Sequence, residues 1–218
     1  MEAKLKPFRV ETTIDAPREV VWRALTTPSV IREWFGWDDE GLEGEIRYIF
    51  VDHAKHLPPD RITLALGQEL QLEADGPHRT VVRAVLPGSL DEADWEDIFD
   101  AIEEGWRTFF EQLRFMVAHS GSGRHTLRLG GKAKPSVATD LARSIGGHEV
   151  WHRSRYQLMF ATPDGRLVGL MAESPLDDDA EGPISLQVTA YGPDGDDNGH
   201  AELRDRWAAL VKDPEFTP

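Results

Sequence analysis

One stretch of the sequence decides the fold: Asp91–Ala118, which reads DEADWEDIFDAIEEGWRTFFEQLRFMVA. Aromatic and aliphatic residues recur in it at spacings of three and four, which is the period of one helix face. They are Trp95, Ile98, Phe99, Ile102, Trp106, Phe109, Phe110, Leu113 and Val117. Acidic residues crowd its first turns, where the helix dipole favours negative charge. We therefore predict one long amphipathic helix over residues 91–118, whose aromatic face needs a large partner.

The segments before this helix predict an antiparallel sheet as that partner. Residues 8–14 alternate between apolar and polar side chains, which is the period of a strand. The same pattern predicts strands at residues 45–51, 62–66, 69–73 and 80–86. Two short helices are expected between the first two strands, one with Pro17 in its first turn and one over residues 29–34.

A shorter version of this order follows the small, polar stretch His119–Gly123, which we interpret as a linker. Strands are predicted at residues 125–129, 155–162, 167–172 and 184–190, with helices at 136–145 and 201–212. The chain is therefore expected to form two α+β domains, residues 1–120 and residues 125–213. The second is interpreted as a degenerate repeat of the first.

Composition limits the function classes. The chain of 218 residues carries 24 basic and 39 acidic side chains, a formal charge of −15, and it has no cysteine. Nucleic acid is excluded as a partner because phosphates would be repelled, and thiolate chemistry is excluded outright. No apolar run approaches the ~18 residues of a membrane span. No apolar segment typical of a leader follows Met1, so a cytoplasmic location is expected.

A family resemblance rests on Ile14–Thr26, which reads IDAPREVVWRALT, on the following Trp34–Trp37, WFGW, and on Gly105-Trp106 with Leu113 seven residues beyond. Over residues 8–118 the chain resembles the START-like helix-grip (SRPBCC, Bet v-like) superfamily. More narrowly, it is similar to the branch of heat-shock-protein ATPase-activator homologues. The resemblance implies a curved antiparallel sheet wrapped around a long helix with a cavity between them. Members bind hydrophobic small molecules, and some are cyclases or hydrolases. The second half loosely resembles proteins with two START-like halves.

Candidate cavity residues are the aromatic side chains of the expected grip. They are Trp34, Trp37, Tyr48, Phe50, Trp95, Phe99, Trp106 and Phe109. Polar anchors could come from Glu45, Arg47, Glu69 and Arg83. The alternative is that these rings only pack the core. No catalytic residue, metal ligand or cofactor is predicted.

Two motifs match metal sites, but their contexts argue against such sites. His148–His152 reads HEVWH, the zinc-protease pattern, which needs a helix. Gly146-Gly147 precedes it and a strand-like pattern follows, so a turn leading into a strand is predicted. Asp194–Gly199 resembles the start of a calcium loop, but a predicted strand precedes it, so a solvated turn is expected. His53 and His56 are assigned to a solvated loop.

Three functions follow from these observations. The first is binding of a hydrophobic small molecule between the sheet and the long helix. The second is a cyclase or hydrolase that uses acid and base groups in the same cavity. The third is a chaperone partner or regulatory interaction module, for which a homodimer or an exposed apolar patch near Trp34–Trp37 would be the sign.

Overall fold

The computed structural model describes residues 6–37, 39–88, 99–145, 149–192 and 197–217. The chain divides into two compact units, Met1–Gly36 with Glu40–Ser120, and Trp37–Asp39 with Gly121–Pro218. Each unit holds one antiparallel sheet with helices, which confirms the predicted α+β class. No helix among the described residues has the length and apolar character needed to cross a membrane.

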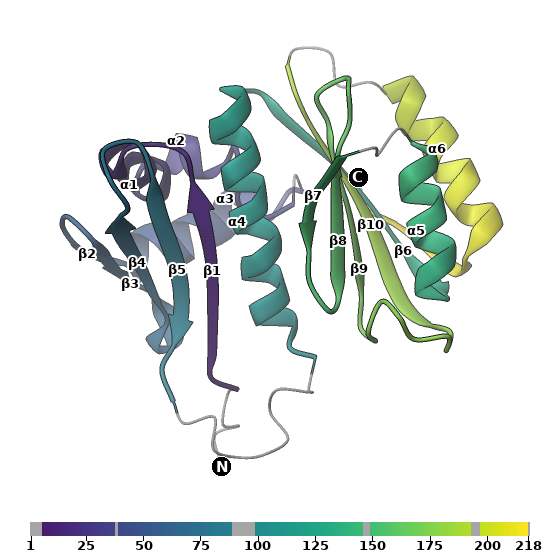
Figure 1. Cartoon of the computed structure of the whole chain (residues 1–218), viewed down its shortest axis with the longest axis horizontal. Coiled ribbons are helices and arrows are strands. Elements are labelled where there is room, and N and C mark those ends of the chain that lie inside the picture. The colour runs from purple at the N-terminus through teal and green to yellow at the C-terminus, as the bar shows by residue number, and fades with distance from the viewer. Residues whose placement is uncertain (1–5, 38, 89–98, 146–148, 193–196, 218) are drawn as a thin grey trace. The chain divides into compact units, whose positions relative to one another are not determined.

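The first unit contains a five-stranded antiparallel sheet in the order β1-β5-β4-β3-β2. Its strands are β1 (Phe8–Ile14), β2 (Lys55–Leu57), β3 (Arg61–Thr63), β4 (Glu69–Ala74) and β5 (Thr80–Leu86). Its helices are α1 (Arg18–Thr26), α2 (Pro28–Ile31), α3 (Leu42–Arg47) and α4 (Ala101–His119), with short turns η1 (Tyr48–Asp52) and η2 (Ala65–Gly67). Figure 1 shows α4 running beside β1, and the two elements are in contact.

One face of this sheet is buried and the other is exposed. In β1, Phe8, Val10, Thr12 and Ile14 are buried while the residues between them are exposed. In β5 the same alternation buries Thr80, Val82, Ala84 and Leu86. The long helix α4 contributes buried Trp106, Phe110 and Leu113. The first unit therefore has the sheet and long helix that the family resemblance implies.

The prediction of a strand at residues 45–51 is wrong. The structure forms α3 and the π-helical turn η1 there. Leu42, Ile46 and Phe50 are buried at a spacing of four, which is helical. Ile46 and Phe50 also fit the alternation of a strand, in which Tyr48 would be buried between them. The Tyr48 side chain is instead 51% exposed, as the helical pattern requires.

The predicted start of the long helix was also wrong in part. Phe99 and Asp100 are not helical, and α4 begins at Ala101. The Asp100 carboxylate accepts hydrogen bonds from the backbone N–H groups of Ile102 and Glu103, at 2.9 and 2.8 Å. Asp100 is therefore the N-cap, which sets the start of the helix even though apolar residues at helical spacing precede it. Residues 91–98 of the predicted helix lie outside the described residues.

The second unit contains a six-stranded antiparallel sheet in the order β11-β6-β10-β9-β8-β7. Its strands are β6 (Arg124–Ala133), β7 (Glu149–Arg153), β8 (Gln157–Ala161), β9 (Leu167–Ala172), β10 (Gly182–Tyr191) and β11 (Lys212–Thr217). Its helices are α5 (Pro135–Ser144) and α6 (Asp197–Leu210). The predicted last helix therefore begins and ends earlier than expected, and β11 was missed.

Both helices of the second unit pack on one face of its sheet (Figure 1). Leu141 and Ala142 of α5 and Leu203 and Trp207 of α6 belong to one core cluster with Leu186 and other strand residues. The Trp207 indole is fully buried, and its Nε1–H donates to the Gly130 carbonyl at 2.8 Å. This bond fixes α6 against β6, and no helix among the described residues of this unit lies on the opposite face of the sheet.

The two units share one topology. In the first, the order is β1-β5-β4-β3-β2, and in the second β6-β10-β9-β8-β7 with β11 added beside β6. In each, helices lie between the first and second strands and one helix follows the fifth strand. The first strand of each unit therefore pairs with its fifth.

Candidate functional site

Six aromatic rings of the first unit contact one another and form what we term the aromatic cluster. Its members are Trp34, Phe35, Phe50, Trp106, Phe109 and Phe110. Phe35 is central: its ring centroid lies 4.7 Å from that of Phe109, 4.8 Å from that of Phe50 and 6.0 Å from that of Trp106. The rings come from the segment after α2, from η1 and from α4. The cluster thus joins three elements that are distant in sequence.

Both tryptophans of the cluster are held by hydrogen bonds. Trp34 Nε1–H donates to the Ala24 carbonyl at 2.9 Å, and Trp106 Nε1–H donates to Gln68 Oε1 at 2.7 Å. A buried indole N–H needs such a partner because leaving it unpaired costs free energy. Trp106 therefore presents an apolar ring to the cluster and a fixed polar end toward the loop before β4.

The structure brings together four of the eight predicted cavity residues: Trp34, Phe50, Trp106 and Phe109. Tyr48 instead lies over the His53 ring, with centroids 4.2 Å apart. Trp37 is grouped with the second unit, and Phe99 lies two residues before α4. Trp95 is outside the described residues. The cluster also contains Phe35, which lies in the same WFGW stretch as Trp34, and Phe110, which follows Trp106 by one helical turn.

The predicted polar anchors lie elsewhere. Glu45 and Arg47 are exposed on α3. Arg83 forms ion pairs with Glu11 and with Glu73 on the exposed face of the sheet, the latter at 2.6 Å. The Arg83 guanidinium, which donates to Glu11, holds the pKa of that carboxyl below its ordinary value of 4.5.

Buried charge in the first unit lies on α4. The Glu111 carboxylate accepts a hydrogen bond from the Thr12 hydroxyl at 2.8 Å and pairs with Arg114 at 2.8 Å. Glu104, also buried, pairs with Arg107 at 3.2 Å. These pairs supply the neutralisation that buried carboxylates require. Both ion pairs lie within α4, and the Thr12 hydrogen bond joins this helix to β1.

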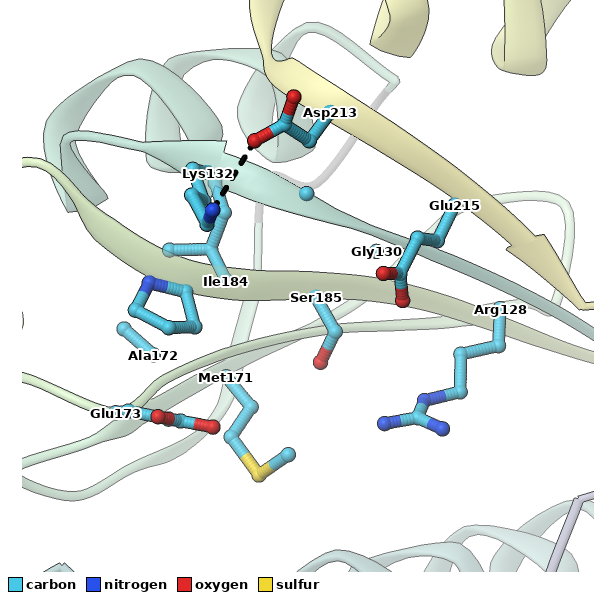
Figure 2. A pocket seen from close by; sticks show the side chains of 12 residues that line it. Arg128, Gly130, Lys132, Met171, Ala172, Glu173, Ile184, Ser185, Asp213 and Glu215 are labelled. Atoms are coloured by element: carbon cyan, nitrogen blue, oxygen red, sulfur yellow. Dashed lines mark hydrogen bonds and ion pairs between the residues drawn. The ribbon is translucent and has the colours of Figure 1, made fainter.

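A pocket of about 310 Å³ opens on the face of the second sheet opposite α5 and α6 (Figure 2). Its wall includes Arg128, Gly130, Lys132, Met171, Glu173, Ser185, Asp213 and Glu215. Lys132 pairs with Asp213 at 3.0 Å, and this hydrogen bond raises the pKa of Lys132 above its ordinary value. The sequence prediction missed this pocket. Its signal is the glycine pair Gly130-Gly131 inside a strand, because glycine there marks a close approach or a gap.

Among the described residues, the motifs that resemble metal sites do not adopt the geometry of a metal site. Glu149–Arg153 forms β7, so the described part of the motif is itself a strand instead of the predicted turn, and it is not the helix of a zinc protease; His148 lies outside the described residues. His53 and His56 are both exposed, and His56 lies in β2 rather than in the predicted loop. Within the described part of the chain, no group of three or more His, Asp or Glu side chains could hold a metal ion. Residues 194–196 of the calcium-like loop are not described.

Comparisons with known proteins give structural likeness only. No protein-family model matches the sequence, and no curated protein matches it. Among solved structures, the chain is similar to DynU16, a protein of the dynemicin biosynthetic locus, with 15% identity, a TM-score of 0.32, and coverage of 94% of this chain and 95% of that one. It is also similar to two di-domain ARO/CYC proteins. BexL of the BE-7585A pathway has 12% identity, a TM-score of 0.37 and coverage of 93% and 92%. StfQ of the steffimycin pathway has 11% identity, a TM-score of 0.30 and coverage of 93% and 93%.

Proposed function

We propose that this protein is a START-like, helix-grip protein that binds a hydrophobic small molecule between the first sheet and α4. The observation that carries the proposal is the aromatic cluster, which gathers rings from three segments at the place where the family resemblance expects a ligand. Trp34, Phe50, Trp106 and Phe109 would contact the ligand directly. Tyr48, Trp95 and Phe99 remain further candidates of the same proposal, whereas Trp37 is grouped with the second unit.

The chemistry of the cluster favours a flat, apolar ligand with one polar end. Ring pairs at 4.7–6.3 Å contribute about 0.5–1.5 kcal/mol each. A planar ligand would replace ring–ring contacts with ring–ligand contacts of similar strength. The Trp106 Nε1–H group donates to Gln68 at the side of the cluster. If this bond breaks, the indole N–H can donate to a polar group of the ligand, and the Gln68 amide can donate or accept.

The proposal includes a duplicated architecture, with START-like halves at residues 1–120 and 125–213. The matching strand orders and the matching positions of the helices support it. The second half would then be a relative of the first that keeps the sheet but packs α5 and α6 tightly on it.

The buried carboxylate of Glu111 in the first unit favours a binding function over a catalytic one. A cyclase or hydrolase would need a titratable group beside the ligand. The buried carboxylate of Glu111 already accepts from Thr12 and pairs with Arg114, so its charge is engaged. An interaction module would work through the surface, and copurification of a protein partner together with an unoccupied aromatic cluster would favour it.

Titration with anilinonaphthalene sulfonate, an apolar fluorescent probe, tests the proposal. The matched pair is Phe109→Leu, inside the cluster, and Trp22→Leu, an aromatic of α1 whose ring neighbour is His56. Probe affinity should fall about three- to tenfold in Phe109→Leu, because ring contacts are lost, and stay unchanged in Trp22→Leu. Native mass spectrometry should show one probe bound. Equal affinities in both variants would reject binding at the aromatic cluster.

A further inference from the structure

Strand alternation gives the second sheet two different faces. Leu127, Leu129, Leu186 and Val188 point to the core formed with α5 and α6. The intervening positions of β6, β10, β9 and β11 point the other way. They include Arg128, Gly130, Lys132, Ser185, Met171, Glu173 and Glu215, all of which line the pocket. The pocket is therefore built entirely from residues of the second unit.

Gly130 lies in the wall of the pocket. Strand register places Glu215 of β11, Gly130 of β6, Ser185 of β10 and Met171 of β9 in one row across the sheet. Directly opposed side chains in such a row normally stand ~4.5–5.5 Å apart and fill it. Gly130 contributes no side chain to the row, and a Cβ added there would lie 3.3 Å from Glu215 Cβ and 3.5 Å from Glu215 Oε2. The glycine therefore leaves room for the Glu215 side chain at the pocket wall.

Charges of both signs surround this pocket. The Arg128 guanidinium lies over the Trp37 ring at 5.0 Å, and among the described residues it forms no ion pair with a carboxylate. The Glu215 carboxylate interacts electrostatically with Lys132. Among the described residues, neither it nor the Glu173 carboxylate forms a hydrogen bond or a close ion pair. Figure 2 shows the Arg128 guanidinium, the Ser185 hydroxyl and the Glu215 carboxylate pointing into the same space. Lys132, by contrast, is engaged by Asp213.

We propose that this pocket is a second binding site, distinct from the aromatic cluster, and that it takes a small zwitterion of the amino-acid class. The ligand carboxylate would pair with Arg128 and accept from Ser185, and its ammonium group would pair with Glu215. A guanidinium suits a carboxylate because it donates two parallel hydrogen bonds. Met171 and the Pro183 ring would contact the aliphatic part. A ligand with only one charge would make only one of these two pairings. The volume of about 310 Å³ is at the small end of ligand pockets.

The probes are L-norleucine, hexanoate, which lacks its ammonium group, and pentylamine, which lacks its carboxylate. Binding to the full chain is measured by calorimetry and by amide chemical shifts. Norleucine should bind about tenfold or more tightly than either analogue, because each analogue loses one charged hydrogen-bonding partner. Arg128→Gln and Glu215→Gln should each weaken norleucine binding by a similar factor. Arg143→Gln, on α5 at the opposite face, is the matched control and should change nothing.

Three outcomes would overturn the proposal. If norleucine shifts no amide resonance of the pocket residues, the proposed binding site is rejected. Hexanoate that binds as tightly as norleucine, and more tightly to Glu215→Gln, shows an anion site instead of a zwitterion site. Equal weakening by Arg128→Gln and Arg143→Gln shows that the effect is one of net charge. Because the aromatic cluster lies in the first unit, Phe109→Leu should leave norleucine binding intact, which separates this test from that of the proposed function.

Discussion

At the residue scale, the adjacent glycines Gly130 and Gly131 shape opposite faces of the second sheet. Gly130 faces the pocket and leaves room there for the Glu215 side chain. Gly131 faces the other side, where an added Cβ would lie 2.6 Å from Val211 Cγ2. The first glycine thus makes room for Glu215 at the pocket wall, and the second allows the chain after α6 to approach β6 closely. One dipeptide therefore shapes both faces of the second sheet.

The Glu11–Arg83 pair predicts a pH-dependent contribution to stability. The pKa of Glu11 is lowered in the folded chain by its hydrogen bond from Arg83. Its contribution should therefore be present above the ordinary pKa of 4.5 and be lost as pH falls through the lower folded value. Glu11→Gln should cost less than about 1 kcal/mol at pH ~7, since the Glu11 side chain is 44% exposed. At pH ~3 the cost should shrink, as urea unfolding would measure.

The exposed Glu202→Gln on α6 is the control for this prediction, because Glu202 forms no ion pair with any described residue. A cost for Glu11→Gln that is the same at both pH values would show that the pair does not carry it.

At the element scale, the start of α4 depends on one side chain. Asp100 satisfies two backbone N–H groups that would otherwise have no partner within the helix. Asp100→Ala should destabilise the protein by about 1 kcal/mol, within a range of ~0.5–2. Urea unfolding measures the change. Asp100→Asn should restore most of the loss, because its amide oxygen can still accept; equal losses in both variants would assign the effect to charge rather than to capping.

Strands with one buried and one exposed face could be predicted from the sequence. Segments whose apolar residues fit both the strand period and the helix period could not. The alternation in β1 identifies it because every intervening residue is polar, whereas β5 is rich in β-branched valine and has Arg83 at the centre of its exposed face. Residues 45–51 failed because positions 46 and 50 satisfy both a strand and a helix. β11 failed because Pro214 and the charged residues Lys212, Asp213 and Glu215 read as a polar tail. The aromatic candidates came from periodicity, but the pocket depends on register between β11, β6 and β10, and alternation within one strand does not contain register.

For the whole molecule, the two cores should respond separately to mutation. Leu186→Ala in the second core should cost about 2–5 kcal/mol and speed amide exchange in β6, β9 and β10. Amides of β1 and β5 should keep their protection, because the units have separate sheets and cores. Val82→Ala in the first core should give the reverse pattern in exchange mass spectrometry. Faster exchange in both sheets from either variant would mean that the two units open as one.

The position of β11 has a consequence for association with other chains. β6 is a strand of ten residues, and β11 pairs with its outer side through a bulged register. Without that cover, the outer N–H and C=O groups of β6 would form a long open edge, which is a template for strand addition and aggregation. The bulge and Pro214 in turn make β11 a poor template itself, because proline lacks the donor that a ladder needs. The strand β11 therefore protects the β6 side of the second sheet from the addition of further strands.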